Sequence, residues 1–184
     1  MLPAPSGARA VVVGGTAWHV VAADVDPEWV AKQVADDPLS APLGARFLSA
    51  LADRIGCEPG VLDVLLVASA AGAPGLDLSP AEVDHPRVER ALLHRTDVQV
   101  WTTSDGSGLL TVGRGVAGRW EAALEVEPSA RGRGLGTAMA RSARAFVPHG
   151  SPLWVQVAPA NTASLRAFLA AGYRPVGAEV LFGP

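Results

Sequence analysis

The spacing of apolar residues changes several times along the chain, and each change predicts an element. Two β-rich runs, Ala10–Val13 and Trp18–Asp24, are joined by Gly-Gly-Thr, so we expect a hairpin or two short strands. Asp26-Pro27 then predicts the start of a helix, with the carboxylate as N-cap and the proline in the first turn. A second helix is predicted over Leu43–Ile55, where apolar residues recur at helical spacing and a glycine follows.

The middle of the chain is less regular. Val61–Ala71 is apolar, and its pattern does not distinguish a helix from a strand. Gly72–Pro80 contains two prolines and two glycines, which favours a linker. Asp84-His85-Pro86 is interpreted as a turn.

The second half predicts an antiparallel meander followed by alternating helices and strands. The expected strands are Asp97–Thr103, Leu109–Val116, Arg119–Glu127, Leu153–Val157 and Tyr173–Phe182, and the expected helices are Gly134–Phe146 and Asn161–Ala171. Asn161 is placed to cap its helix at the N-terminus and Gly172 to end it. The fold class that follows is α/β (α+β), with a mixed, mostly antiparallel twisted sheet flanked by helices.

Composition narrows the class of protein. The chain has 184 residues, of which 49% are hydrophobic and 18% charged, enough apolar residues for a packed core. A net charge of −3 argues against the dense basic surface that nucleic-acid binding needs. Lys32 is the single lysine whereas arginine is abundant, which we interpret as the coding bias of a GC-rich bacterium.

The same survey predicts a cytoplasmic protein without a membrane partner. Cys57 is the one cysteine, so an intramolecular disulfide is impossible and a reducing compartment is expected. Met1–Ala10 lacks the features of a signal peptide, and the apolar stretch Val64–Leu76 is too short to span a bilayer. The four histidines have no metal-ligand spacing, so no metal site is predicted.

The segment with the clearest chemistry is Arg131-Gly132-Arg133-Gly134-Leu135-Gly136-Thr137, which follows a predicted strand and opens a helix. The first amides of a helix lack internal partners, and the helix dipole adds partial positive charge there. Glycines let phosphate oxygens approach the backbone, and two arginines add full charge, so the segment suits a phosphate or pyrophosphate. The alternative is that the glycines only allow close packing and the arginines are solvated.

Two nucleotide-binding patterns fit this loop poorly. It is not a Walker loop, because no Gly-Lys-Ser/Thr follows. The dinucleotide pattern requires a glycine where Thr137 stands, and Leu153–Val157 offers no acidic residue for a ribose.

Strand, Arg131-x-x-Gly134-x-Gly136 and helix together resemble the acyl-CoA loop of the GNAT (GCN5-related) N-acetyltransferases. A second signature of that family is an Asn that opens a helix, followed by Gly-aromatic eleven and twelve residues later, which Asn161 and Gly172-Tyr173 match. The resemblance covers roughly Asp97–Phe182, and it implies a GNAT-like fold.

The resemblance also implies a set of cofactor contacts. The loop amides from Arg131 to Thr137 would hold the CoA pyrophosphate, and the backbone of Leu124 and Val126 would pair with the pantetheine arm. Asn161 and Ser164 would touch the cofactor as well, unless Asn161 only caps its helix and Ser164 is only a surface residue. Phe168 is included because the family's usual acid, a tyrosine, stands at this position.

Acetyl transfer from acetyl-CoA to a primary amine is the activity that the resemblance implies, by direct attack in a ternary complex. Phe168 has no proton to donate to the leaving thiolate, so a non-catalytic acyl-CoA sensor stays open as an alternative. Candidate bases are Glu125 and Glu121, four apart on one strand, with Glu179 as a further candidate. A generic phosphate-binding protein is a third reading, which the second signature disfavours.

The predicted organisation has two parts. Residues 1–80 show no assignable motif and are expected to form part of the acceptor side, with Trp29 and Phe47 near the substrate, whereas residues 81–184 form the acyl-CoA-binding core. The expected partner is a small-molecule or peptide amine, and a homodimer is possible.

Overall fold

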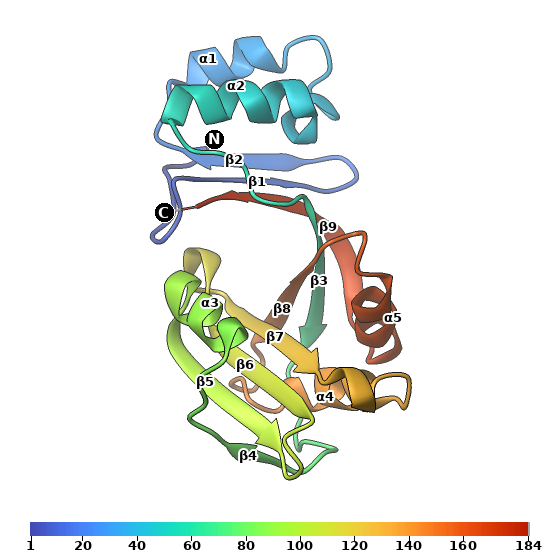
Figure 1. The fold of residues 1–184 in the computed structure, drawn as a ribbon. Coiled ribbons are helices and arrows are strands. Elements are labelled where there is room, and N and C mark those ends of the chain that lie inside the picture. The colour runs from blue at the N-terminus through green and yellow to red at the C-terminus, as the bar shows by residue number, and fades with distance from the viewer. Residues whose placement is uncertain (184) are drawn as a thin grey trace. The chain divides into compact units, whose positions relative to one another are not determined.

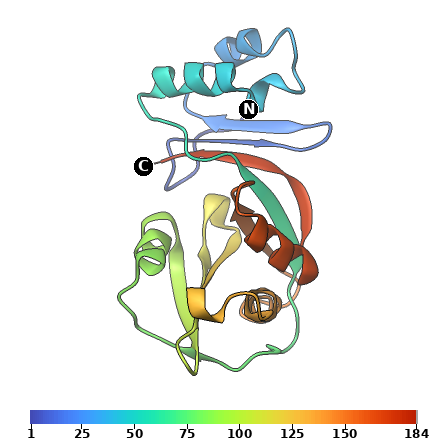
Figure 2. The ribbon, with the colours of Figure 1, turned by 45° about the vertical axis from the view of Figure 1, so that its right-hand side comes forward.

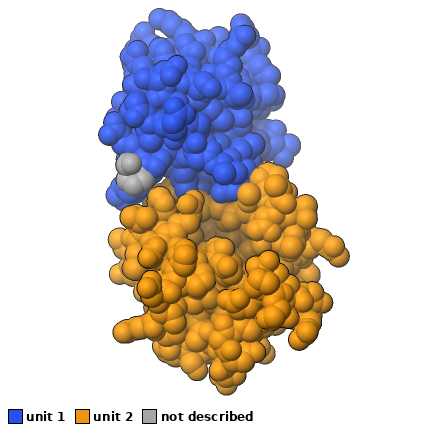
Figure 3. All heavy atoms as spheres, in the orientation of Figure 1, with its two compact units in different colours: residues 1–65, 176–184 blue, residues 66–175 orange. Residues whose placement is uncertain are grey.

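The computed structural model describes residues 1–183 and has two compact units (Figure 3). Unit 1 contains Met1–Leu65 and the chain from Val176 onward, and unit 2 contains Leu66–Pro175. This division differs from the boundary expected at residue 80. The reason is that the C-terminal strand β9 (Arg174–Phe182) pairs antiparallel with the N-terminal strand β1 (Ala10–Gly14), which makes the end of the chain part of unit 1.

Unit 1 is built on the hairpin of β1 and β2 (His19–Ala23), which are antiparallel neighbours with Val12 opposite Val21. Helices α1 (Pro27–Gln33) and α2 (Ala45–Ile55) lie over these strands, with a short 3-10 turn, η1 (Ala41–Leu43), between them (Figure 1). Phe47, Leu51 and Phe182 are among the residues of the core that these elements enclose.

Two of the predicted helix ends in unit 1 are confirmed. The Asp26 carboxylate accepts a hydrogen bond from the Glu28 N–H at 2.9 Å, as an N-cap does. Gly56 ends α2 in the left-handed conformation, with φ of 63°. Trp29 and Phe47, which were expected near the substrate, contact each other in the core of this unit, with ring centroids 6.2 Å apart.

Unit 2 carries the remaining elements. In chain order they are β3 (Asp63–Ser69, which begins in unit 1), β4 (Leu78–Pro80), α3 (Pro86–His94), β5 (Thr96–Thr103), β6 (Gly108–Arg114), η2 (Val116–Gly118), β7 (Trp120–Val126), η3 (Pro128–Ala130), α4 (Leu135–Ala143), β8 (Pro152–Val157) and α5 (Thr162–Ala170). The strand order is β8-β7-β6-β5-β4, and β3 stands between β9 and β8. β4 to β7 pair antiparallel, and β7 pairs parallel with β8, so the predicted mixed, mostly antiparallel α/β fold is confirmed.

Helices cover both faces of the strands in unit 2. Helix α4 packs against β6, β7 and α5, whereas α3 packs against β5, β6 and β7. Side chains show that these are opposite faces. On β7, Val126 lies near Gly136 of α4, and the neighbouring Glu125 points to Arg87 of α3. Figure 2 shows α3 and α4 on the two sides of these strands.

Some elements were not predicted, and others have different bounds. Pro86 is the first residue of α3 rather than part of a turn, because His85 caps that helix by accepting the Arg87 N–H at Nδ1. β4 is an edge strand of three residues inside the expected linker, and the ambiguous run Val61–Ala71 contains β3. Among the residues described, no helix is long and apolar enough to cross a membrane.

Candidate functional site

An opening in unit 2 lies where β7 and β8 part. Their parallel ladder contains Trp120 opposite Leu153 and Glu121 opposite Trp154, and in the described residues it ends there. β7 continues to Val126 while still paired with β6 on its other side. Burial changes at the same point, since Glu121 and Ala122 are buried and the next four residues of β7 are half-buried.

The pairing with β6 decides which backbone groups of β7 face this opening. The Glu127 N–H donates to the Ser107 carbonyl at 2.8 Å, so residue 127 directs its N–H towards β6. Backbone groups of an antiparallel strand alternate between its two edges. The N–H and C=O groups of Leu124 and Val126 are therefore directed to the opposite edge, where β8 has separated from β7.

A cavity of about 650 Å³ occupies this region. Its wall combines the end of β7, the loop before α4, and one side of α5. The lining residues are Arg87, Leu124, Glu125, Val126, Ala130, Arg131, Gly132, Gly134, Leu135, Gly136, Thr137, Asn161, Ala163, Ser164, Arg166, Ala167 and Ala170. The structure thus brings the glycine loop and Asn161, the first residue of the second signature, to one cavity.

Glycines shape the loop end of the cavity. Gly132 and Gly134 have φ of 76° and 85°, a backbone region that other residues rarely adopt. Gly134 is the N-cap of α4, so the first amides of that helix, at Leu135, Gly136 and Thr137, open at the cavity wall.

The two arginines of the loop have different surroundings. Arg131 lines the cavity, and its Nε donates to the Val126 carbonyl at 2.8 Å, which ties the loop to the end of β7. Arg133 is exposed and is not part of the lining, although a cofactor contact was expected for it.

Asn161 caps α5, as its position in the sequence predicts. Its Oδ1 accepts the Ser164 N–H at 3.1 Å, and both residues line the cavity. Capping uses the carbonyl oxygen of the side chain, so its amide NH₂ group is the end suited to donate towards a ligand.

Glu125 lies at the cavity wall and contacts Arg87, a residue outside both sequence signatures. Arg87 Nε, at the start of α3, donates to Glu125 Oε2 at 2.8 Å. This hydrogen bond is the main reason why the pKa of Glu125 is lowered from its ordinary value of 4.5. The carboxylate is consequently a weak base near neutral pH.

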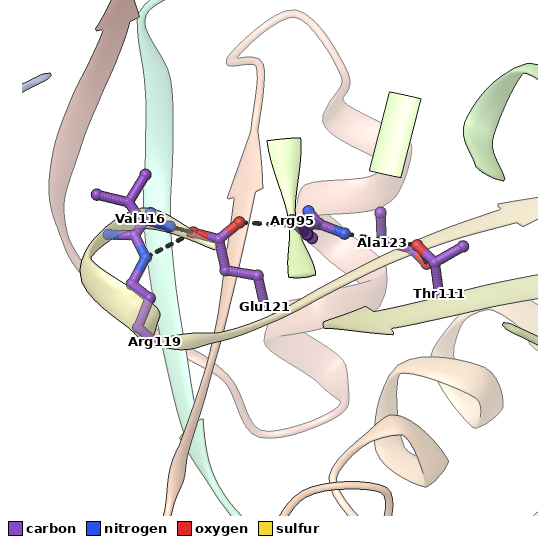
Figure 4. A network of polar contacts seen from close by, with 6 residues as sticks. All are labelled: Arg95, Thr111, Val116, Arg119, Glu121 and Ala123. Atoms are coloured by element: carbon purple, nitrogen blue, oxygen red, sulfur yellow. Dashed lines mark hydrogen bonds and ion pairs between the residues drawn. The ribbon is translucent and has the colours of Figure 1, made fainter. Parts of the chain in front are cut away.

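Glu121 lies at the point of divergence, outside the cavity lining, in a buried polar network (Figure 4). Its side chain is 5% exposed and accepts from Arg95 Nε at 3.1 Å, from Arg119 Nε at 2.8 Å and from the Val116 N–H at 3.2 Å. A Cβ at Gly115 would overlap the carboxylate, which explains the glycine there. Burial lowers the pKa of Arg95, and Glu121 opposes this shift.

The position of Phe168 corrects the expectation that it touches the cofactor. Its ring is 4% exposed and packs edge-on against Tyr173, with centroids 5.0 Å apart, because it points from α5 into the core rather than into the cavity. Tyr173 is the one tyrosine of the chain, and its hydroxyl donates to the Ala140 carbonyl at 3.0 Å. Burial raises the pKa of this hydroxyl far above its ordinary value.

Among the described residues, no group of three or more His, Cys, Asp or Glu side chains is arranged to hold a metal ion. The other candidate base, Glu179, is buried in β9 of unit 1 opposite Val13. Arg87, Ala163, Arg166, Ala167 and Ala170 line the cavity without having been predicted. Helical spacing from Asn161 could have identified those on α5, whereas nothing in the sequence relates Arg87 to the loop.

Comparison with known families finds a match for part of the chain. Residues 105–173 match the model of the acetyltransferase (GNAT) family. The matched region contains the two diverging strands, the glycine loop, α4 and α5. No curated protein matches the sequence.

Solved structures are similar as well. An acetyltransferase from the GNAT family of Colwellia psychrerythraea aligns with 12% identity and a TM-score of 0.50, over 90% of this chain and 76% of that protein. A GCN5-related N-acetyltransferase from Kribbella flavida aligns with 17% identity and a TM-score of 0.46, over 97% of this chain and 90% of that protein. At 12% identity, the similarity to the Colwellia psychrerythraea protein shows a shared fold and nothing more.

Proposed function

We propose, on the premise that this chain contains a GNAT acetyltransferase domain at residues 105–173, that it transfers an acetyl group from acetyl-CoA to a primary amine. The observation that carries the proposal is the parting of β7 from β8 after Glu121, beside the glycine loop that opens α4. The pantetheine arm of acetyl-CoA would then lie along the free edge of β7, and its pyrophosphate would lie next to it at the glycine loop.

Different parts of the cavity wall suit the pyrophosphate and the pantetheine arm of acetyl-CoA. First-turn amides at Leu135, Gly136 and Thr137 suit the pyrophosphate, since they offer donors at the positive end of a helix. A Cβ at Gly136 would make ordinary van der Waals contact with Val126 Cγ2 at 3.7 Å and with Ala167 Cβ at 3.8 Å, so this glycine lies between β7 and α5. The backbone of Val126 and Leu124 suits the amide groups of pantetheine.

The reaction that this arrangement supports is direct transfer. The amine nitrogen attacks the thioester carbon, a C–N bond forms, and the C–S bond breaks to release CoA thiolate. Holding both substrates in one cavity supplies much of the rate. The Leu124 N–H, directed into the opening, would donate to the carbonyl oxygen as negative charge develops on it.

Proton transfer in this proposal does not use a tyrosine. Phe168 has no hydroxyl, and the Tyr173 hydroxyl is buried and bonded to Ala140. The attacking amine therefore loses its protons to water, and the thiolate leaves as such or takes a proton from water. This predicts slow turnover that depends on the fraction of neutral amine.

A second candidate follows from the same observation. An acyl-CoA sensor, which binds the ligand without transferring its acyl group, needs the cavity but needs no side chain to protonate a leaving thiolate. Thiol release with a panel of primary amines separates the two functions. Release that depends on the amine supports transfer, and stabilisation by acetyl-CoA without release supports a sensor.

A further inference from the structure

The cavity wall carries an ion pair that the GNAT signatures do not include. Arg87 Nε lies 2.8 Å from Glu125 Oε2, and each of the two side chains is 35% exposed. Both residues line the cavity. In the part of the chain that the structure describes, this is the single side-chain hydrogen bond of either residue. The Nη groups of Arg87 and the Oε1 atom of Glu125 thus keep hydrogen-bonding capacity.

The pair lies on the face of β7 that the pyrophosphate does not use. Side chains alternate along a strand, and Val126 points to α4, so Glu125 points to the other face, where α3 contributes Arg87. The first-turn amides of α4 are on the Val126 side. A ligand that contacts the pair therefore approaches the opening from the side opposite the phosphates, which leaves room for both substrates at once.

A joined cation and anion are complementary to a ligand that carries both charges close together. The guanidinium has five N–H donors and binds carboxylates through a fixed fork, and the bond to Glu125 uses only Nε. The other carboxylate oxygen of Glu125, Oε1, can accept a donor from a ligand. An acceptor with several cationic groups and no anion would instead bring positive charge against Arg87.

Building on the proposed function, we propose that the acceptor is a free α-amino acid, whose carboxylate binds the Arg87 Nη groups and whose ammonium group binds Glu125 Oε1. Its two charges sit on one carbon, which matches the short distance between the two side chains. The ammonium group loses one proton to water before attack. After the C–N bond forms and the C–S bond breaks, a second proton leaves nitrogen, and the products are an N-acetyl amino acid and CoA thiol.

The test uses matched substrates and the full-length protein. CoA thiol release is measured with the twenty amino acids and with the carboxamide of each one that reacts, and every rate is expressed per concentration of neutral amine. We expect at least one amino acid to react with a kcat/KM at least about tenfold above that of its amide, since a hydrogen bond to a charged group is lost. Arg87→Gln should remove this preference. Arg90→Gln, an exposed arginine on the same helix and outside the cavity, should preserve it.

Other outcomes overturn the proposal. Equal or faster reaction of the amides, or reaction of other amines and of no amino acid, would refute the amino-acid acceptor while leaving acetyl transfer in place. Stabilisation by acetyl-CoA without any reaction would refute the acceptor and favour the sensor. An absence of both stabilisation and release would refute the proposed function itself.

Discussion

Glu121 of β7 stands opposite Trp154 of β8, at the last pair of their parallel ladder. The same carboxylate receives the guanidinium groups of Arg95, at the end of α3, and Arg119, at the start of β7. One buried anion thus joins the end of α3 to β7 at the point where the strands separate. We interpret this network as what holds the narrow end of the opening in place.

Glu121→Gln should destabilise the protein by about 3 kcal/mol, because removing one partner of a buried ion pair leaves charge uncompensated. Arg95, whose side chain is 10% exposed, loses the negative charge that it contacts. Urea unfolding of the variant measures the change. Glu127→Gln serves as the control, since Glu127 is exposed and should change stability by less than about 0.5 kcal/mol. Equal midpoints for the two variants would contradict this role for Glu121.

Phe168→Tyr, which restores the family's usual residue, should not increase turnover. The ring points into the core against Tyr173, so the new hydroxyl would be buried rather than placed at the thiolate. We expect a loss of about 1–3 kcal/mol in stability from the buried polar group. Thiol release and thermal unfolding test this together. A tenfold rise in kcat would show that residue 168 reaches the leaving group.

Glu125→Gln should leave the pH at which activity rises unchanged. Arg87 holds the pKa of Glu125 below 4.5, so its carboxylate is already ionised well below neutral pH. A rise in kcat/KM around neutral pH therefore reports the acceptor amine losing its proton, and it continues as pH increases. The pH profiles of wild type and variant measure this. Loss of the rising limb in the variant would identify Glu125 as the base.

Much of unit 2 is predictable because its signals are local. The turn residues between β5, β6 and β7 separate clear β-rich runs, and Asn161 and Gly172 mark the two ends of α5. The glycine loop is identified for the same reason. Left-handed backbone at Gly132 and Gly134, followed by a helix, is encoded within seven residues.

The rest depends on contacts between distant segments. Helix α3 begins at Pro86 because the His85 side chain caps it. Histidine is seldom an N-cap, so the sequence around Pro86 is equally compatible with a turn. Arg87 meets Glu125 across 38 positions, and no periodicity relates them. The strand at the end of the chain was predicted, but its pairing with β1, which assigns it to unit 1, is a long-range contact that no local pattern indicates.

Whether acetyl-CoA binds at the glycine loop is decided by two matched variants, Gly134→Glu and Gly150→Glu. Both glycines are exposed and left-handed, with φ of 85° and 82°, so both substitutions cause similar backbone strain. Only Gly134 lines the cavity, where glutamate adds bulk and negative charge beside the pyrophosphate position. Calorimetric titration should show that wild type and Gly150→Glu bind acetyl-CoA, and that Gly134→Glu does not. Equal affinity in all three proteins, or no binding to wild type, would contradict the account.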